Sequence, residues 1–278
     1  MNQFINHQIT NPDFPYFYSK YFIKTMNNNH DYPKHFARFY DSIYFGLRDP
    51  YDKNYYLKQI ADAAGKVLEA GVGTGRLFKT ALLEGADIYG IDMSEAMLAE
   101  LYDKIDPEEH HRISRQSVVD FHFDFEFDLV IAPFRVMSHI LSKEDQLKTL
   151  NNVYDHLNPG GTFIFDAFVP DLKYIIEGFE NFVDFEDDDE YGNPVTRTVT
   201  TRPDLITQII EADFVMQWEE GGETKQEQWR APLRFFFRYE LEHLVERSAF
   251  DSYQIFGDFK GGALTKNSTE FVVVCRKD

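Results

Sequence analysis

Apolar and polar residues follow two different periods along this chain. Between residues 32 and 45 the apolar positions recur every three or four residues, which predicts one buried face of a helix (Phe36, Phe39, Tyr40, Ile43 and Tyr44). A second helix is predicted for residues 52–64. Short apolar runs then alternate with helical patterns, with strands predicted at residues 66–70, 87–91, 127–132 and 162–165 and helices after residue 75 and at residues 94–102 and 143–157. This alternation predicts βαβ units and a mostly parallel sheet.

The pattern changes between residues 181 and 238. Strand-like runs at residues 196–200, 205–218 and 226–237 are separated by glycine-containing turns, which predicts an inserted antiparallel β subdomain over residues 181–238. The acidic run Glu186–Glu190 is interpreted as a solvated hairpin tip rather than a metal site. A helix at residues 239–249 and strands at residues 253–257 and 270–276 follow. We expect residues 31–180 and 239–278 to form the main domain, and residues 1–30 an irregular arm.

Charge and cysteine content exclude several classes of partner. The 278 residues carry a formal net charge of −19, so nucleic acid and anionic membranes would be repelled. No run of about 18 apolar residues could span a bilayer, and Cys275 has no second cysteine to pair with. We therefore expect a soluble, cytoplasmic protein. His122 and His156 lack the spacing of metal ligands, so no metal is expected.

A glycine-rich turn between a predicted strand and helix is the most informative motif. Gly71, Gly73 and Gly75 follow the strand that contains Glu69, and such a turn lets the backbone approach a ligand closely. A dinucleotide-binding fingerprint would require its third glycine at position 76, which is arginine. Glu69 would repel a pyrophosphate but suits an ammonium group. At the end of the next strand, Asp92 is placed to accept hydrogen bonds from two ribose hydroxyls, so a zwitterionic nucleoside fits best.

These segments resemble a known enzyme family. EAGVGTGRL followed by YGIDMSEAML is similar to motifs I and II of class I S-adenosylmethionine-dependent methyltransferases, and FDLVIAPFRVMSHI and LNPGGTFIFDAF resemble that family's fourth and fifth strands. The resemblance covers about residues 36–170. It implies an α/β, Rossmann-like fold with a mostly parallel seven-stranded sheet, helices on both faces, and an inserted antiparallel lid over the acceptor site.

The same resemblance implies which residues bind S-adenosylmethionine. Asp92 would hold the ribose, and Met93 and Met97 would flank the adenine, although Met97 could equally be core. The family usually has an aspartate after the third strand, where this chain offers Ser117 and Val118. The full set of expected cofactor-binding residues is Tyr40, Glu69, Gly71, Gly73, Gly75, Asp92, Met93, Met97, Ser117, Val118 and Pro133.

Candidate catalytic residues come from two segments. Residues 133–139 follow the fourth predicted strand, and ligands of open α/β sheets bind beyond the carboxyl ends of the strands. His139 could accept a proton from the acceptor there, or could be structural. FARFYDSIY resembles a segment of sugar-amine and other small-molecule N-methyltransferases, which implies that Tyr40 or Tyr44 faces cofactor or acceptor; ordinary amphipathic packing is the alternative. Arg135, Arg234 and Arg238 could bind an anionic acceptor or pair with acidic residues.

The expected function is methyl transfer from S-adenosylmethionine to an amine or hydroxyl of a small molecule, by direct in-line displacement, with His139 and Tyr44 as catalytic residues. One alternative is a regulatory protein that binds the cofactor or a nucleoside without turnover. A less favoured alternative is an NAD-dependent oxidoreductase. The acceptor, the choice between nitrogen and oxygen, and a monomer or homodimer remain open.

Overall fold

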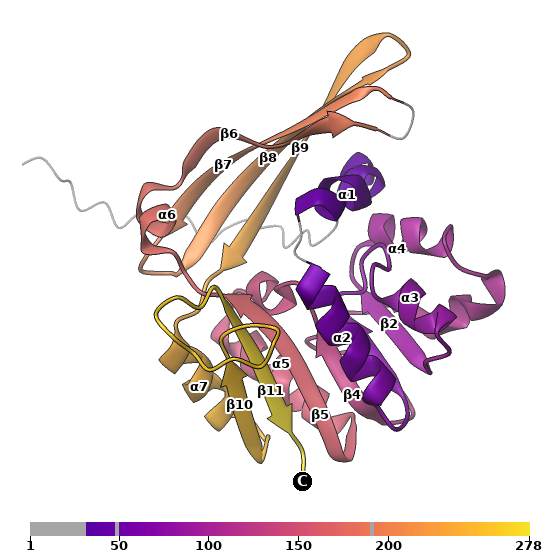
Figure 1. The fold of residues 1–278 in the computed structure, drawn as a ribbon, viewed down its shortest axis with the longest axis vertical. Helices are drawn as coiled ribbons and strands as arrows, with labels where there is room; N and C mark the ends of the chain where they lie inside the picture. Colours follow the sequence, from indigo (N-terminus) through magenta and orange to yellow (C-terminus); the bar gives the residue numbers. More distant parts are fainter. Residues whose placement is uncertain (1–31, 48–49, 190–191) are drawn as a thin grey trace, which may run out of the picture.

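The computed structural model describes residues 32–47, 50–189 and 192–278, so the arm expected at residues 1–30 lies outside the described residues. Seven strands form the main sheet in the order β10-β11-β5-β4-β1-β2-β3 (Figure 1). Their bounds are β1 Val67–Ala70, β2 Ile88–Asp92, β3 Ile113–Arg115, β4 Phe127–Ala132, β5 Leu157–Phe168, β10 Ser252–Phe256 and β11 Glu270–Arg276. β11 runs antiparallel to its two neighbours, β10 and β5. All the remaining neighbouring strands, from β5 through β4, β1 and β2 to β3, pair in parallel. The predicted mostly parallel, seven-stranded sheet is confirmed.

Alternate residues of each central strand enter two separate cores, because the sheet is covered on both faces. Leu68, Val130 and Phe163 point into a core shared with α5 (Lys143–Asp155) and α7 (Arg238–Glu246). Their chain neighbours Val67, Leu129 and Ile164 point into a core shared with α2 (Pro50–Asp62), α3 (Phe78–Leu83) and α4 (Glu95–Tyr102). No helix of the described residues is both long enough and apolar enough to cross a membrane.

Helix starts in the main domain follow local chemistry. The Ser94 side chain caps α4 by accepting a hydrogen bond from the Met97 N–H, and Ser142 caps α5 through the Asp145 N–H. Two short 3-10 helices, η1 (Pro107–Arg112) and η2 (Val136–His139), follow α4 and β4. Ser94 thereby fixes the first turn of α4, which follows directly after Asp92 at the end of β2.

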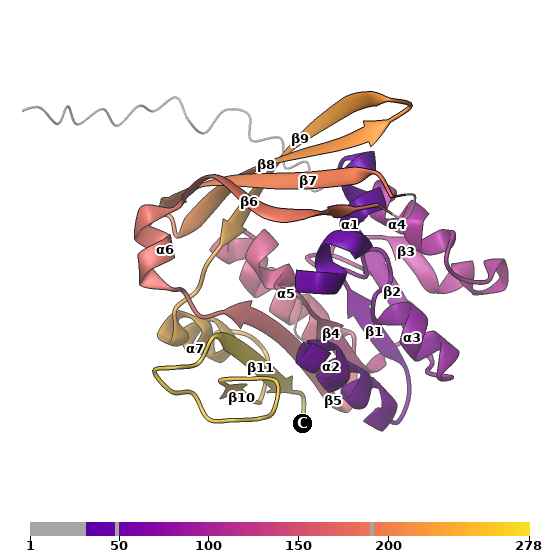
Figure 2. The same cartoon turned by 45° about the horizontal axis from the view of Figure 1, so that its top comes forward.

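A second sheet forms a lid over the carboxyl ends of the main strands (Figure 2). It is an antiparallel meander of β6 (Phe179–Asp188), β7 (Pro194–Asp204), β8 (Ile209–Glu220) and β9 (Glu223–Arg234), entered through α6 (Leu172–Glu177). The sequence pattern missed β6, because this edge strand is mostly exposed and shows no apolar alternation. It also began the next strand at residue 205, whereas β7 extends to Asp204 and residues 205–208 form the turn before β8.

Most of the described acidic run is solvated at the end of a hairpin, as expected, and Asp189 is the exception. Glu186, Asp187 and Asp188 belong to β6, and Asp189 is buried, where its carboxylate accepts a hydrogen bond of 2.8 Å from the Asn193 N–H. Glu186, Asp187 and Asp188 therefore end a strand, and Asp189 binds residues of the β6–β7 turn.

Helix α1 (Lys34–Leu47) lies beneath the lid and packs against it rather than against the main sheet (Figure 2). Phe36, Phe39 and Ile43 form a third core with lid residues, among them Met216 and Trp218. On its other side, α1 is tied to the glycine turn, because Asp41 accepts a 2.5 Å hydrogen bond from Thr74 and pairs with Lys104 at 2.6 Å. α1 thus bridges the lid and the main domain.

Candidate active site

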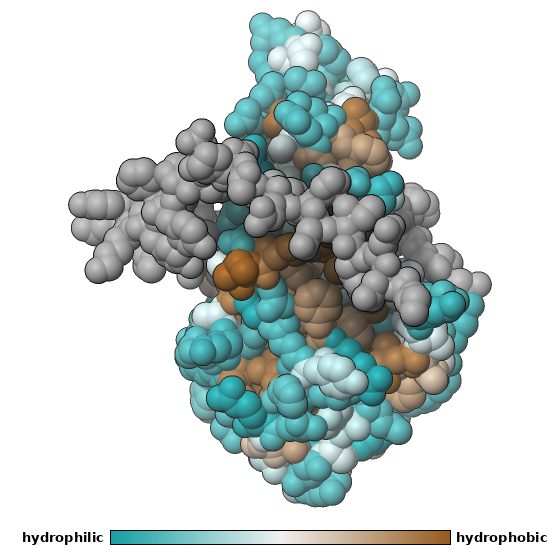
Figure 3. Space-filling model, turned by 90° about the vertical axis from the view of Figure 1, so that its left-hand side faces the viewer, coloured by the Kyte–Doolittle hydropathy of each residue, from teal (hydrophilic) through white to brown (hydrophobic). Residues whose placement is uncertain are grey.

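One large cavity lies between the lid and the carboxyl ends of the parallel strands. Its volume is about 1010 Å³, and its walls come from the glycine turn, the end of β2, residues 116–119, the loop after β4, α1, the lid and the loop between β10 and β11. β1 lies between β4 and β2, so the chain leaves β1 and β4 in opposite directions, and ligands of open α/β sheets bind at such a switch point. Figure 3 shows apolar surface at the waist between the lid and the main domain.

The structure brings most of the predicted site residues to this cavity. Those that line it are Tyr40, Tyr44, Gly71, Gly73, Asp92, Met93, Met97, Ser117, Val118, Pro133 and His139. Glu69 and Gly75 do not line it. Lid residues that the sequence pattern could not assign complete the wall: Ile209, Phe214, Trp229, Ala231, Pro232 and Leu233. Their only signal in the sequence was a β-rich, aromatic segment.

The three glycines of the turn have positive φ angles but different surroundings. A Cβ added at Gly73 (φ +54°) would meet no described atom within 4 Å, so this glycine borders open space. At Gly71 a Cβ would lie 2.4 Å from a methyl group of Val136, and at Gly75 it would lie 2.3 Å from Leu101 Cδ1. Gly73 therefore borders the space where a ligand would lie, whereas Gly71 and Gly75 permit close packing within the protein.

The Asp92 carboxylate organises the ligand side of the turn. It accepts hydrogen bonds of 2.9 Å from the Gly73 N–H and 2.8 Å from the Ser94 N–H. The first bond couples the end of β2 to the glycine turn after β1. A carboxylate at the cavity wall in this position can still accept hydrogen bonds from ribose hydroxyls.

Glu69 lies beneath the turn and is only 2% exposed. Burial raises the pKa of Glu69 to about 8, against the opposing effects of Arg76 and of a hydrogen bond from the Phe78 N–H. Its Oε2 atom has no hydrogen-bond partner among the described residues. Arg76 itself forms an ion pair with Asp52 of α2, with contacts of 2.5 and 3.1 Å. A cationic ligand group above the turn would favour the ionised form of this buried, incompletely paired carboxyl group, whereas a pyrophosphate would be repelled by that form.

Aromatic rings line the cavity on the α1 side. The ring centroids of Tyr40 and Tyr44 are 4.5 Å apart, and Phe134 lies 5.2 Å from Tyr44. The Tyr44 hydroxyl accepts a hydrogen bond of 3.1 Å from Arg197 of the lid. The Arg197 residue is 3% exposed, and its guanidinium also donates to Asp184 through two contacts of 2.9 and 2.8 Å. No sequence pattern indicates this contact, because 153 residues separate its partners.

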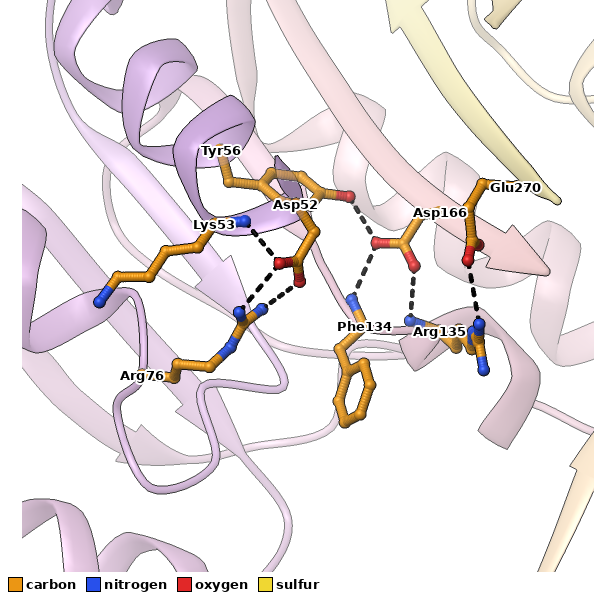
Figure 4. Close-up of polar contacts among 8 residues, drawn as sticks. All are labelled: Asp52, Lys53, Tyr56, Arg76, Phe134, Arg135, Asp166 and Glu270. Atoms are coloured by element: carbon orange, nitrogen blue, oxygen red, sulfur yellow. Dashed lines mark hydrogen bonds and ion pairs between the residues drawn. The ribbon is translucent and has the colours of Figure 1, made fainter. Parts of the chain in front are cut away.

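The loop after β4 begins with an unusual turn (Figure 4). Phe134 and Arg135 have φ angles of 59° and 63°, in the left-handed region that residues other than glycine rarely adopt. Both N–H groups donate to the carboxylate of Asp166 in β5, at 2.8 and 3.0 Å, and the Tyr56 hydroxyl donates to the same carboxylate at 2.6 Å. The sequence signal for this site was an aspartate inside an otherwise apolar strand.

The arginines considered for anion binding all have acidic partners. Arg135 lies 3.0 Å from Glu270, Arg234 2.5 Å from Glu240, and Arg238 2.7 Å from Glu242. Of the two interpretations of these arginines, the structure therefore shows pairing with acidic residues.

Comparisons with known proteins identify the fold and the domain. Residues 67–161 match the family model described as "Methyltransferase domain". A glycine/sarcosine N-methyltransferase of Halorhodospira halochloris is 24% identical over 245 residues, which cover 86% of this chain and 85% of that protein. Among solved structures, an S-adenosylmethionine-dependent methyltransferase from Clostridium acetobutylicum superposes with a TM-score of 0.70 at 18% identity, covering 87% of this chain and 98% of that one.

A second solved structure contains the cofactor. An amino pentose methyltransferase from Micromonospora echinaspora, with S-adenosylmethionine bound, has a TM-score of 0.64 at 16% identity and covers 86% of this chain and 96% of that one. The segment matched by the family model runs from β1 into β5, so it includes the glycine turn, Asp92 and the turn after β4.

Proposed function

We propose that this chain, an S-adenosylmethionine-dependent methyltransferase, methylates an amine on a small molecule such as an amino sugar or an aryl-bearing amine. The observation that carries the proposal is that the glycine turn and Asp92 line the same cavity as an aromatic wall covered by the lid. Small-molecule pockets usually measure about 300–1,000 Å³, so about 1010 Å³ leaves room for an acceptor beside the cofactor. An amino group on an alcohol-rich or aromatic body fits such a wall better than a free carboxylate, because Arg135 is paired with Glu270.

The residues on the wall fit the cofactor. Asp92 would hold the ribose hydroxyls, Gly71 and Gly73 would lie along the methionine part, and Met93, Met97, Ser117 and Val118 would surround the adenine. Glu69 would act beneath the turn on the ammonium group through water, since it does not line the cavity, and the nearby cation would favour its ionised form. When bound, the cofactor supplies a methyl group attached to a sulfonium sulfur. An in-line nucleophile takes the methyl group, and the sulfur side leaves as a neutral thioether.

The protein's own residues position the nucleophile and handle its proton. Attack requires a neutral amine, so an ammonium must lose one proton, and His139 at the cavity wall is placed to accept it. Tyr44 accepts a hydrogen bond from Arg197, which leaves its own O–H to orient the acceptor. The lid excludes water and holds the acceptor against the aromatic wall, and this alignment supplies most of the rate enhancement.

Binding and turnover test different parts of this proposal. Calorimetric titration with S-adenosylmethionine and with NAD should show binding of the former only. Asp92→Ala should weaken binding by at least about tenfold, since hydrogen bonds to charged groups contribute about 1.5–3 kcal/mol. The control is Asp87→Ala, which removes an aspartate that pairs with Lys66 and Arg112 next to the other end of β2. Preference for NAD would refute the cofactor assignment.

The acceptor is tested with a panel of amines and their matched alcohols, with S-adenosylhomocysteine release and product mass as readouts. Amino sugars and aryl-bearing amines should be methylated, and glycine and the alcohols much more slowly. Methylation of the alcohols alone would refute the amine assignment. Cofactor binding without turnover on any member of the panel would instead favour the regulatory alternative.

A further inference from the structure

The geometry points to Asp166 and Tyr56 as positioning residues that hold the turn after β4, and with it the acceptor side of the cavity, in its working shape. The inference rests on the proposed function only in its link to the acceptor; the state of the turn can be measured without any acceptor. Asp166 lines the cavity and Tyr56 does not, and the two come from a strand and a helix and lie 110 residues apart in the chain.

Two successive left-handed residues aim their N–H groups at one point. Phe134 and Arg135 both have φ near +60°, and consecutive N–H groups arranged in this way form a small concave anion site. Here the anion is the Asp166 carboxylate, whose Oδ1 accepts from the Phe134 N–H and Oδ2 from the Arg135 N–H. An asparagine could accept only one of these bonds, because its amide nitrogen is a donor. The carboxylate therefore holds two backbone conformations that neither side chain favours.

Tyr56 completes the arrangement from the other side of Asp166 (Figure 4). Its hydroxyl lies 2.6 Å from Asp166 Oδ1, and its side chain is fully buried in the core beneath α2. Burial, followed by the Asp166 carboxylate, raises the pKa of Tyr56 well above its usual value, so the hydroxyl stays protonated and donates a hydrogen bond to Asp166. Asp166 is itself only 3% exposed, and a charge in this position needs its hydrogen bonds.

The turn decides where two cavity residues point. It places the Phe134 ring 5.2 Å from Tyr44 and 6.5 Å from Tyr40, and it brings Arg135 within 3.0 Å of Glu270. A change of either φ to a negative value would redirect both side chains. The aromatic wall and the charge pair opposite the lid would then separate, while Gly73 and Asp92, on the cofactor side, would keep their places.

The sharpest test compares two neighbouring tyrosines. Tyr56→Phe removes only the hydroxyl that donates to Asp166. Tyr55→Phe is the matched control, because its ring packs on Phe259 at 5.7 Å, much as that of Tyr56 does at 5.9 Å, and its hydroxyl makes no hydrogen bond within the described ranges. Asp166→Asn is the stronger perturbation of the same group. Each variant is measured by amide hydrogen exchange over residues 133–138, by calorimetry with S-adenosylmethionine, and by steady-state kinetics.

For Tyr56→Phe we expect exchange at residues 134 and 135 to quicken by about tenfold, while the cofactor Kd stays within about twofold of the wild type. The KM for the amine acceptor found in the panel should rise by about tenfold, with little change in the KM for the cofactor. Tyr55→Phe should leave all of these unchanged. Unchanged exchange in both Tyr56→Phe and Asp166→Asn would refute the structural part, and faster exchange without a selective rise in acceptor KM would refute the positioning role.

An Arg135→Gly background distinguishes a specific effect of Asp166 on the turn from a general loss of stability. Glycine adopts positive φ freely, so in an Arg135→Gly background the fall in melting temperature caused by Asp166→Asn should shrink by about half. An equal fall in both backgrounds would contradict the claim that Asp166 holds the left-handed turn. If the wild type methylates no amine, the proposed function fails, but the exchange and melting experiments still decide the state of the turn.

Discussion

Replacing Gly73 with alanine should separate ligand binding from protein stability, because the added methyl group would enter the cavity rather than the packed interior. Its φ is +54°, and a Cβ at this position meets no described atom within 4 Å. Gly85 in the turn before β2 provides a matched control, since its φ is +88°, its Cβ would also meet no described atom within 4 Å, and it does not line the cavity. Any difference between the two variants therefore reports what occupies the space beside Gly73.

The stability cost should be similar in the two variants. An alanine in the left-handed region costs about 1–2 kcal/mol, partly offset by about 0.4–1 kcal/mol from the less flexible unfolded chain. A net loss of about 1 kcal/mol lowers the melting temperature of a chain of this size by roughly 2–4 °C. Binding should differ, because a methyl group forced into an occupied volume costs about 1–3 kcal/mol. The Kd of Gly73→Ala for S-adenosylmethionine should therefore rise by about 5- to 150-fold, and that of Gly85→Ala should not change.

Differential scanning calorimetry and isothermal titration with S-adenosylmethionine measure the two quantities on the same samples. Wild-type affinity in Gly73→Ala would show that the space beside Gly73 is unoccupied in the complex, contrary to the prediction. An equal loss of binding in Gly85→Ala would also contradict the prediction, because backbone strain alone would then account for the effect.

Three further predictions address the surroundings of the site. Gly75→Ala should destabilise the protein by about 2–4 kcal/mol in chemical denaturation, because its Cβ would lie 2.3 Å from Leu101 in addition to the left-handed strain. Arg197→Met should cost about 3 kcal/mol of stability and lower kcat, because it removes the hydrogen bonds from Arg197 to Asp184 and to Tyr44. Arg197→Lys should recover less than half of the activity, because lysine cannot donate to both oxygens of Asp184 in the way that arginine does. The pKa of Glu69 is raised on folding to about 8, so its protonated form is stabilising: wild-type stability should decline as pH rises from about 4.5 to about 8, and Glu69→Gln should flatten this decline in denaturation curves recorded across that range.

The parts of the molecule that could be predicted from sequence are those specified by neighbouring residues. The strand and helix periods, the N-caps at Ser94 and Ser142 and the glycine turn each depend on residues within one turn or strand, and these features were found. The motif could not show that Glu69 and Gly75 do not line the cavity. The regular spacing of its glycines does not reveal which of them borders open space and which packs against another side chain.

Contacts between distant segments were out of reach for the same reason. Asp166 and Tyr56 are 110 residues apart, and Arg197 and Tyr44 are 153 residues apart, so only the packing of β5 on α2 and of the lid on α1 brings them together. An aspartate in an apolar strand signals an internal partner but does not identify it. β6 was not predicted because this exposed edge strand has no buried face, so its apolar residues do not alternate along the sequence.

The position of α1 bears on how such an enzyme could be re-engineered for a new acceptor. The lid is one uninterrupted insertion between α6 and α7, which invites a graft of residues 179–234 from another protein. Yet Phe36, Phe39 and Ile43 of α1 are buried against the lid, and Tyr44 is held by its Arg197. A transplanted lid would meet a helix shaped for the original one, so the exchangeable module consists of two pieces, residues 34–47 and 179–234, that must be moved together. Recombination between relatives should succeed when both pieces come from the same parent and fail when they do not.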